Sequence, residues 1–213
     1  MNAPVSGVAR IPAELSALDA APLMCAGLTT FNALRHCGIR PGDLVAVQGI
    51  GGLGHLGIQF ARRLGARVVA VSRGDDKRAL ALELGAHDYV DGANDDAAAA
   101  LRGMGGARVI LATAPNAKAV AALAGGLGLD GTLMIVAAPG DPVPVSALTL
   151  ISTRGSVRGW ASGTPADSED TMKVAVLEGI RPTIETYPLS RAEEAYGRMM
   201  SSDVRFRAVL IPD

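Results

Sequence analysis

Short runs with strand character alternate with helical stretches through the middle of this chain, and this alternation restricts the fold more than any other feature. The five clearest runs lie at residues 44–49, 67–72, 87–91, 108–114 and 132–138. Apolar residues at helical spacing fill the stretches between them. Strands that alternate with helices at this spacing pair in parallel through right-handed crossover connections.

The runs are almost continuously apolar, which is typical of a parallel sheet with helices on both faces. A further run at residues 156–161 predicts a sixth strand, and helices are expected at about 75–84, 95–104 and 168–180. The expected fold class is therefore α/β, with a doubly wound, parallel six-stranded sheet and flanking terminal elements.

A glycine-rich turn joins the first predicted strand to the helix after it. Gly49, Gly51 and Gly54 form the pattern G-x-G-x-x-G, with Gly52 and Leu53 in the same loop. In a dinucleotide-binding (Rossmann) turn, the first glycine permits the sharp turn, the second admits the pyrophosphate, and the third allows close helix packing. The helix N-terminus then faces the phosphates. A glycine-rich turn without a ligand is the alternative, but strand, spacing and helix together favour a cofactor site.

The end of the second predicted strand favours NADP(H) over NAD(H). NAD-binding versions of this turn place an acidic residue there, about 20 positions after the glycines, to bind the ribose hydroxyls. Here the strand ends in Ser72, followed by Arg73 and Lys77, which can donate hydrogen bonds to a 2′-phosphate. Asp75 and Asp76 keep the alternative open, because one of them could replace the missing acid or cap the next helix.

Charge and composition disfavour several classes of partner. The chain has 20 basic and 21 acidic residues and a net charge of -1, which gives no support for nucleic acid or a membrane surface as partner. No apolar run is long enough to span a bilayer, and residues 1–15 lack the apolar stretch of a secretory signal. The two cysteines, Cys25 and Cys37, indicate no disulfide framework. We expect a cytoplasmic protein.

Three segments resemble the zinc-type medium-chain alcohol dehydrogenase family. They are APLMCAGLTTFNAL at 21–34, RPGDLVAVQGIGGLGHLGIQFARRLGARVVAVSR at 40–73 and LELGAHDYVD at 82–91. The tail at residues 180–210 resembles the ending of the same family, so the resemblance runs from about Pro22 to the C-terminus. The sequence looks most similar to the cinnamyl-alcohol-type and bacterial NADP-dependent branch.

The resemblance implies a two-domain enzyme in which an N-terminal domain supplies most catalytic groups and the Rossmann domain binds the coenzyme. Cys25 matches the zinc ligand that the family takes from this region, beside a Cys and a His of the N-terminal domain. The zinc polarises the alcohol or carbonyl oxygen while the nicotinamide exchanges a hydride. Thr29 matches a threonine near the nicotinamide, so the resemblance makes Cys25 and Thr29 the expected catalytic residues.

The family's other zinc ligands and its G-H-E segment have no match in this sequence. The remaining candidate ligands are His36, Cys37, His55 and His87. Cys37 is expected to be a small packed residue, and His55 a helix-start residue facing the pyrophosphate. Because a catalytic zinc needs about three protein ligands, we expect zinc at Cys25 only if a catalytic domain is supplied.

Further cofactor contacts are expected where the predicted strands end, because ligands of open α/β sheets lie at the carboxyl ends of the strands. Thr113 falls at the end of the fourth predicted strand, and Val136, Ala137 and Ala138 end the fifth, where the family places the nicotinamide. Each of these positions is also explained as a small residue in a tight loop.

The resemblance divides the chain into three parts. Residues 1–20 are the expected remnant of the segment linking to the absent catalytic domain, residues 21–185 the Rossmann domain, and residues 186–213 a C-terminal helix and strand that would pack on that domain. Because the helix around Leu23–Leu34 and the last strand would lose this cover, we expect exposed apolar surface and self-association.

The expected function is hydride transfer between NADP(H) and an alcohol or aldehyde, incomplete in the isolated chain. A stand-alone NADP(H)-binding module without catalysis is the alternative, and Cys25 disfavours zinc-free carbonyl or quinone reduction. The expected partners are the nicotinamide dinucleotide, a small alcohol or aldehyde, and either a second copy of the chain or a separate catalytic-domain chain.

Overall fold

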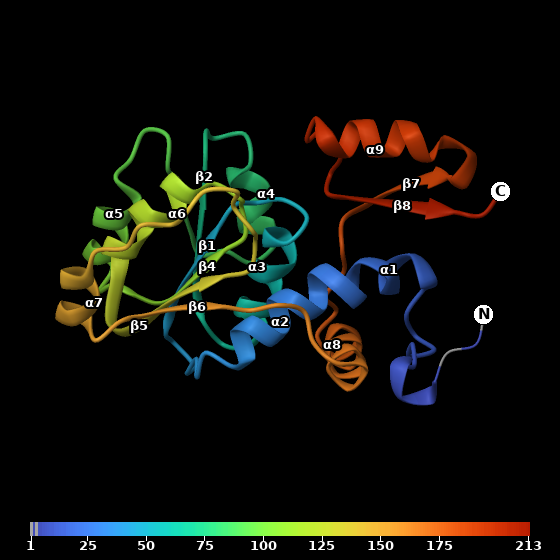
Figure 1. Cartoon of the computed structure of the whole chain (residues 1–213), viewed down its shortest axis with the longest axis horizontal. Coiled ribbons are helices and arrows are strands. Elements are labelled where there is room, and N and C mark those ends of the chain that lie inside the picture. Colours follow the sequence, from blue (N-terminus) through green and yellow to red (C-terminus); the bar gives the residue numbers. More distant parts are fainter. Residues whose placement is uncertain (1, 3) are drawn as a thin grey trace.

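A parallel six-stranded sheet forms the centre of the computed structural model, which describes residues 2 and 4–213 (Figure 1). The strand order is β3-β2-β1-β4-β5-β6. The strands are β1 (Leu44–Gln48), β2 (Arg67–Ser72), β3 (Asp88–Asp91), β4 (Ala107–Ala112), β5 (Leu127–Ile135) and β6 (Ser156–Gly159). The order starts at β1 and runs outward in both directions, as in a doubly wound sheet. The predicted α/β fold class is confirmed.

Helices cover both faces of this sheet. The described part of the chain forms the helices α1 (Ala17–Pro22), α2 (Leu28–Arg35), α3 (Gly54–Arg63), α4 (Arg78–Glu83), α5 (Ala97–Gly103), α6 (Ala117–Leu123), α7 (Ala147–Thr153), α8 (Pro165–Leu177) and α9 (Ala192–Met200). Of these, α9 packs on β7 and β8, and α1 contacts β8, outside this sheet. Side chains of the strands alternate between the two faces. Val45 and Val47 of β1 therefore join a core with α2, α3 and α8, whereas Leu44 and Ala46 join a second core with α5 and α6.

Local capping signals set the start of several helices. The Asp96 side chain accepts a hydrogen bond from the N–H of Ala99 at 2.9 Å, which begins α5. Asn116 does the same for α6, with the N–H of Ala119 at 3.0 Å. Thr164 begins α8 with a capping box. Such side chains satisfy N–H groups that have no partner inside the helix.

Several predicted element boundaries are wrong, and helix α8, for example, spans Pro165–Leu177 instead of 168–180. Helix α4 begins at Arg78 instead of 75, because residues 73–77 form a turn after β2. Strand β5 begins at Leu127 instead of 132, and Leu127 pairs with Ala107 of β4. Residues 128–131 are Gly, Leu, Asp and Gly, which are mostly turn-forming types and conceal the strand from a pattern search.

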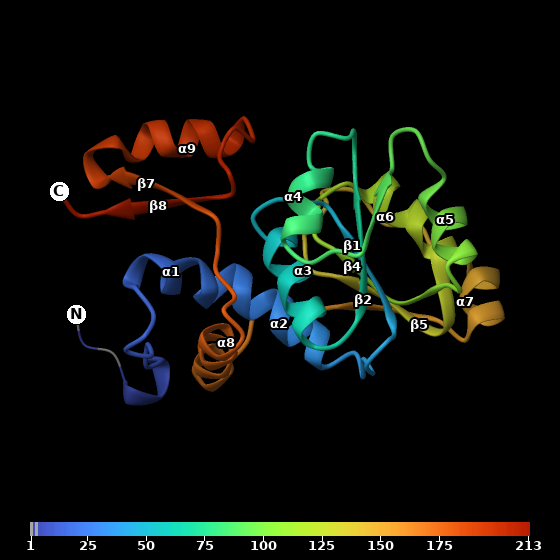
Figure 2. The same ribbon diagram turned by 180° about the vertical axis from the view of Figure 1, so that it is seen from behind.

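The C-terminal unit, residues 184–211, is a small β-α-β layer. Its strands β7 (Ile184–Pro188) and β8 (Arg207–Ile211) pair in parallel, and α9 connects them. The terminal apolar strand thus finds its partner within the chain, and the boundary expected between 185 and 186 falls inside β7. Figures 1 and 2 show this unit on the α1 and α8 side of the molecule, opposite α7.

The expectation that residues 23–34 expose an apolar face is wrong. Leu23, Leu28, Phe31 and Leu34 are all buried. Helix α8 follows the last strand of the sheet and contacts α2 and the turn before it, so the chain itself covers this surface.

Among the residues that the structure describes, no helix is both long and apolar enough to cross a bilayer.

Candidate functional site

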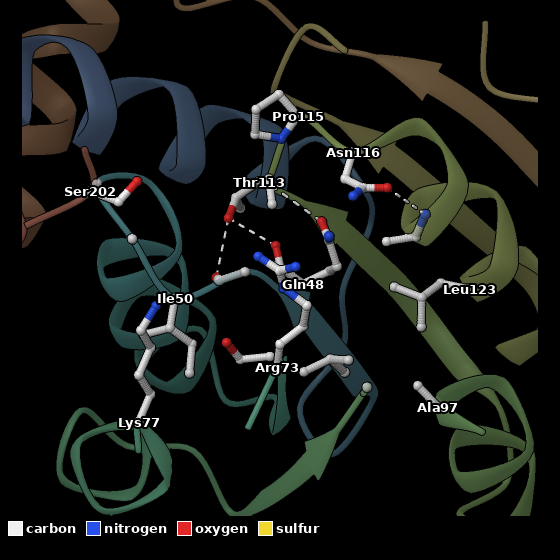
Figure 3. Close-up of a pocket in the computed structure, with 18 of the residues that line it drawn as sticks. Gln48, Ile50, Arg73, Lys77, Ala97, Thr113, Pro115, Asn116, Leu123 and Ser202 are labelled. Atoms are coloured by element: carbon white, nitrogen blue, oxygen red, sulfur yellow. Dashed lines mark hydrogen bonds between the residues drawn. The ribbon is translucent and has the colours of Figure 1, made fainter. Parts of the chain in front are cut away.

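A pocket of about 830 Å³ lies where β1 and β4 end, at the point where the strand order reverses. Open α/β sheets bind ligands at this position. Five parts of the chain form its walls: the glycine turn at 49–52, the end of β2 with the turn after it, the segment at 92–98, the segment at 113–123, and the C-terminal turn at 202–207. Figure 3 shows Arg73 and Lys77 on the opposite side of the pocket from Ala97 and Leu123.

The glycine turn presents backbone to the pocket because side chains do not fit behind it. Gly49 has φ +90°, and a Cβ there would lie 2.9 Å from the Cβ of Ala114. A Cβ on Gly54 would lie only 1.8 Å from the carbonyl oxygen of Gly49. A Cβ on Gly51 would meet nothing within 4 Å. The turn is therefore closed toward the protein and open toward the pocket at Gly51.

Gln48 and Thr113 connect the ends of β1 and β4. The Thr113 hydroxyl donates to the carbonyl oxygen of Gln48 at 2.9 Å, and the N–H of Ala114 donates to the Gln48 side chain at 3.2 Å (Figure 3). Both residues line the pocket. Thr113 was predicted from its place at a strand end, but Gln48, the last residue of a buried strand, was not.

The predicted residues after β2 come together at one end of the pocket, lined by Ser72, Arg73, Asp76 and Lys77. Within the described part of the chain, neither Arg73 nor Lys77 forms an ion pair. Asp75 does not line the pocket, because its carboxylate pairs with Arg78 at 2.5 Å. Of the two acids that kept the NAD alternative open, only Asp76 faces the pocket.

Asp91 holds the backbone of the turn after β2 through hydrogen bonds. Its carboxylate accepts hydrogen bonds from the N–H groups of Gly74 at 2.7 Å and Ala93 at 2.9 Å. The hydrogen bond from Ala93, followed by that from Gly74, lowers the pKa of Asp91. Since the Tyr89 hydroxyl also donates to the carbonyl oxygen of Gly74 at 2.6 Å, the backbone that carries Arg73 is held from two sides.

The C-terminal turn supplies a wall that the sequence analysis missed. Ser202, Arg205, Phe206 and Arg207 all line the pocket. Arg207 crosses the glycine turn so closely that a Cβ on Gly52 would lie 2.8 Å from its Nη1 atom. Alternation of Arg205 and Arg207 around Phe206 was the available signal, because residues two apart in an extended chain share a face.

The prediction that His55 faces a pyrophosphate is wrong. His55 is fully buried and does not line the pocket. Its Nε2 accepts a hydrogen bond from the N–H of Thr183 at 3.1 Å, so its Nδ1 carries the proton and donates to the carbonyl oxygen of Gly51 at 2.8 Å. Its ring lies 5.0 Å from that of Phe206. Burial lowers the pKa of His55 to about 4.

Several predicted site residues lie outside the pocket lining: Cys25, Thr29, Leu53, Gly54, Val136, Ala137 and Ala138. Val136 extends the pairing of β5 by donating its N–H to the carbonyl oxygen of Ala112 at 3.1 Å. Thr29 is buried in α2, and Cys25 is exposed in the π-helical turn Leu23–Gly27. The expected roles of Cys25 as a zinc ligand, of Leu53 and Gly54 in the glycine turn, and of Thr29 and residues 136–138 near the nicotinamide stay predictions.

The described residues do not by themselves fit a catalytic zinc site. At residues 2 and 4–213, no group of three or more His, Cys, Asp or Glu side chains is placed to hold a metal ion. His36 contacts a backbone carbonyl oxygen at 2.8 Å, and His87 accepts the N–H of Val68 at 2.9 Å. Cys37 is a packed residue, as predicted, and burial raises the pKa of its thiol to about 11.

Sheet order, glycine turn and crevice together define a Rossmann-type dinucleotide-binding fold. A sequence model of the family described as zinc-binding dehydrogenase matches residues 52–176. The chain belongs to this family, and the resemblance to zinc-type alcohol dehydrogenases is confirmed.

Individual relatives agree with this assignment. An alcohol dehydrogenase of Aspergillus sp. (strain MF297-2) is 44% identical over 203 residues, which cover 95% of this chain and 60% of the relative. A cinnamyl alcohol dehydrogenase structure from Sorghum bicolor matches 95% of this chain and 57% of its own, with TM-score 0.85 and 30% identity. A Helicobacter pylori structure, complexed with NADP(H), matches 94% and 56%, with TM-score 0.75 and 25% identity. The chain thus spans 56% to 60% of the length of these proteins.

Proposed function

We propose that this chain binds NADP(H) in the pocket at the end of β1 and β4, as the coenzyme-binding part of an oxidoreductase acting on an alcohol or aldehyde. The main support is the pocket itself, whose volume of about 830 Å³ lies in the range of cofactor sites. Bound there, NADP(H) supplies the hydride chemistry. The residues of this chain bind and orient it.

The pyrophosphate is proposed to lie on the glycine turn, where Gly51 leaves the backbone open. Helix α3 begins directly after this turn, so the positive end of its dipole lies beside this place. Arg207, which crosses the turn at Gly52, adds a positive charge that attracts a diphosphate. Thr113 and Gln48 keep the strand ends at a fixed spacing beneath it.

The proposed preference for NADP(H) rests on the turn after β2. Ser72 stands where NAD-binding turns carry an acid, and the cations Arg73 and Lys77 line the same end of the pocket. A guanidinium binds a phosphate through two parallel hydrogen bonds. The one pocket-lining acid in this turn, Asp76, contacts Arg205 at 3.9 Å, which offsets its repulsion of a 2′-phosphate.

Catalysis is proposed to need a further domain, in the same or in a separate chain. We propose that residues 1–20 lead to it, that residues 21–185 bind the coenzyme, and that the helix and strand within 186–213 pack on it. Cys25 is proposed as a zinc ligand only where that domain supplies the other ligands. The alternative, a stand-alone NADP(H)-binding module, is favoured by the absence of a three-ligand group among the described residues.

A second copy of this chain is a further proposed partner. β6 is one of the two edge strands of the sheet, and Leu148 and Ile151 of α7, the helix that precedes it in the chain, are each 73% exposed. An uncovered edge strand with apolar neighbours is suited to pairing with another chain.

We also propose a cytoplasmic location. Its support is that residues 1–15 lack the apolar stretch of a secretory signal and that the two cysteines indicate no disulfide framework.

Titration calorimetry of the purified chain with NADPH and NADH tests the central proposal. We expect binding of both coenzymes and at least about tenfold tighter binding of NADPH, the scale of one charge-assisted contact. A well-folded sample that releases no heat with either coenzyme would remove the proposal. Turnover of an alcohol only after a catalytic domain is added distinguishes the enzyme from the stand-alone module.

A further inference from the structure

An ion pair at the pocket joins two distant parts of the chain. Asp76 belongs to the turn after β2, and Arg205 belongs to the C-terminal turn. The guanidinium Nη2 of Arg205 lies 3.9 Å from the carboxylate Oδ2 of Asp76. Both side chains line the pocket and remain about half exposed, at 53% and 60%. An exposed pair at this separation is weak and easily exchanged.

The main chain of Arg205 is held more firmly than its side chain. The N–H of Arg205 donates to the carboxylate of Glu185 at 2.8 Å. Glu185 is held in turn by the guanidinium of Arg198 and the hydroxyl of Tyr187, each at 2.8 Å. The hydrogen bond from Arg205 is the largest cause of the lowered pKa of Glu185, so this acceptor stays ionised. The guanidinium of Arg205 therefore moves about a fixed backbone position.

We propose that Arg205 determines coenzyme specificity by transferring its guanidinium from the carboxylate of Asp76 to the 2′-phosphate of NADP(H). This inference rests on the proposed function and deepens it. The 2′-phosphate would enter the end of the pocket lined by Arg73, Asp76 and Lys77. A phosphate carries more charge than a carboxylate and offers more acceptor oxygens, so it is the better partner for a guanidinium fork.

Asp76 holds the guanidinium at the pocket when no phosphate is present. With NADH, whose ribose carries a hydroxyl, the carboxylate can accept that hydroxyl while Arg205 stays paired. The two residues therefore act in opposite directions: Arg205 favours the phosphorylated coenzyme, and Asp76 favours the other. A residue that only supports the fold would affect both coenzymes alike.

The dissociation constants of NADPH and NADH for the full chain and its variants test this assignment. For Arg205→Ala we expect NADPH to bind about tenfold more weakly, the scale of one charge-assisted contact, and NADH to change by less than about twofold. Arg205→Lys should fall between, because the ammonium keeps the charge but loses the fork. Asp76→Asn should tighten NADPH and weaken NADH.

Arg191→Ala is the matched control. Arg191 pairs with Glu194 at 2.6 Å in the same C-terminal unit and does not line the pocket, so neither coenzyme should respond. Adenosine 2′,5′-bisphosphate against 5′-AMP gives a second measurement free of nicotinamide contacts.

The outcomes separate this inference from the proposed function. Equal losses for NADPH and NADH in a folded Arg205→Ala variant would overturn the inference and leave dinucleotide binding standing. No change for either coenzyme would also overturn it. A wild-type chain that binds neither coenzyme would remove the proposed function itself.

Discussion

The Nε2 atom of His55 accepts the backbone N–H of Thr183 at 3.1 Å. This buried hydrogen bond connects the start of α3 to the segment leading into β7. The same ring contacts Gly51 through its Nδ1 atom. The glycine turn and the C-terminal unit, which both line the pocket, are therefore joined through one neutral imidazole.

His55 should make the stability of the protein fall in mild acid. Burial lowers its pKa from 6.5 to about 4, so the unfolded chain binds more protons than the folded chain between these values. Its contribution is complete above pH 6.5 and is lost as the pH falls toward 4. Linkage gives a loss of about 2 kcal/mol between pH 7 and pH 5.

Urea unfolding of the wild type and of His55→Gln at pH 7 and pH 5 measures this loss. The wild type should lose about 2 kcal/mol more than the variant over this interval, because glutamine does not titrate. Parallel losses in the two proteins would show that His55 does not titrate as its burial requires.

Two glycine substitutions should separate coenzyme binding from stability. A Cβ on Gly51 meets no protein atom within 4 Å, so Gly51→Ala should leave the melting temperature within about 2 °C, as for a surface change. It should still weaken NADPH at least about tenfold, because the methyl group occupies the approach to the pyrophosphate.

Gly54→Ala provides the contrast. Its Cβ would lie 1.8 Å from the carbonyl oxygen of Gly49, so this variant should unfold at a clearly lower temperature. Calorimetric melting and coenzyme titration of both variants provide the comparison. Unchanged NADPH affinity in a folded Gly51→Ala protein would contradict the placement of the pyrophosphate.

Arg73→Ala should reduce NADPH affinity about tenfold or more, with little effect on NADH. Arg73 lines the pocket beside Ser72 and Lys77, and a single guanidinium–phosphate contact is charge-assisted. Arg102→Ala, on α5 outside the pocket lining, is the control. Fluorescence titration with both coenzymes measures the two affinities. Similar losses of affinity for NADPH and NADH would refute a 2′-phosphate contact.

A lysine on the edge strand should abolish self-association. Val157 lies on β6 and is 40% exposed, so Val157→Lys places a charge where a second sheet would pair. Sedimentation velocity should show a dimer for the wild type and a monomer for the variant. Leu177→Lys, at a position of α8 that is 79% exposed, should leave the dimer intact. A monomeric wild type would contradict the proposed partner.

The sheet and its glycine turn could be predicted because their signals are local. The spacing of Gly49, Gly51 and Gly54 after a strand specifies a turn without reference to the rest of the chain. Ser72, Arg73 and Lys77 were found for the same reason, since they follow directly from the end of β2.

The wall that the C-terminal turn forms could not be predicted in this way. Arg207 reaches the glycine turn, and Arg205 reaches the turn after β2, only because β7, α9 and β8 fold back beside α1. That docking joins segments that lie far apart in the sequence. His55 shows a related limit. The sequence placed His55 in the first turn of α3. The side of the helix on which its ring lies depends on packing against Phe206, and the sequence does not show that contact. The sequence also could not show which of Asp75 and Asp76 faces the pocket. The structure distinguishes them by their partners, since Asp75 pairs with Arg78 and Asp76 with Arg205.

The division of β1 between two cores has a consequence for inserted and deleted residues. Val45 and Val47 face one core, and Leu44 and Ala46 face the other. A single-codon insertion within this strand would exchange the two sets, since strand side chains alternate with a period of two. It would also move the G-x-G-x-x-G pattern by one position relative to the neighbouring strands. Changes of length are therefore expected in loops outside β1 and the glycine turn, whereas β1 itself is expected to vary by substitution.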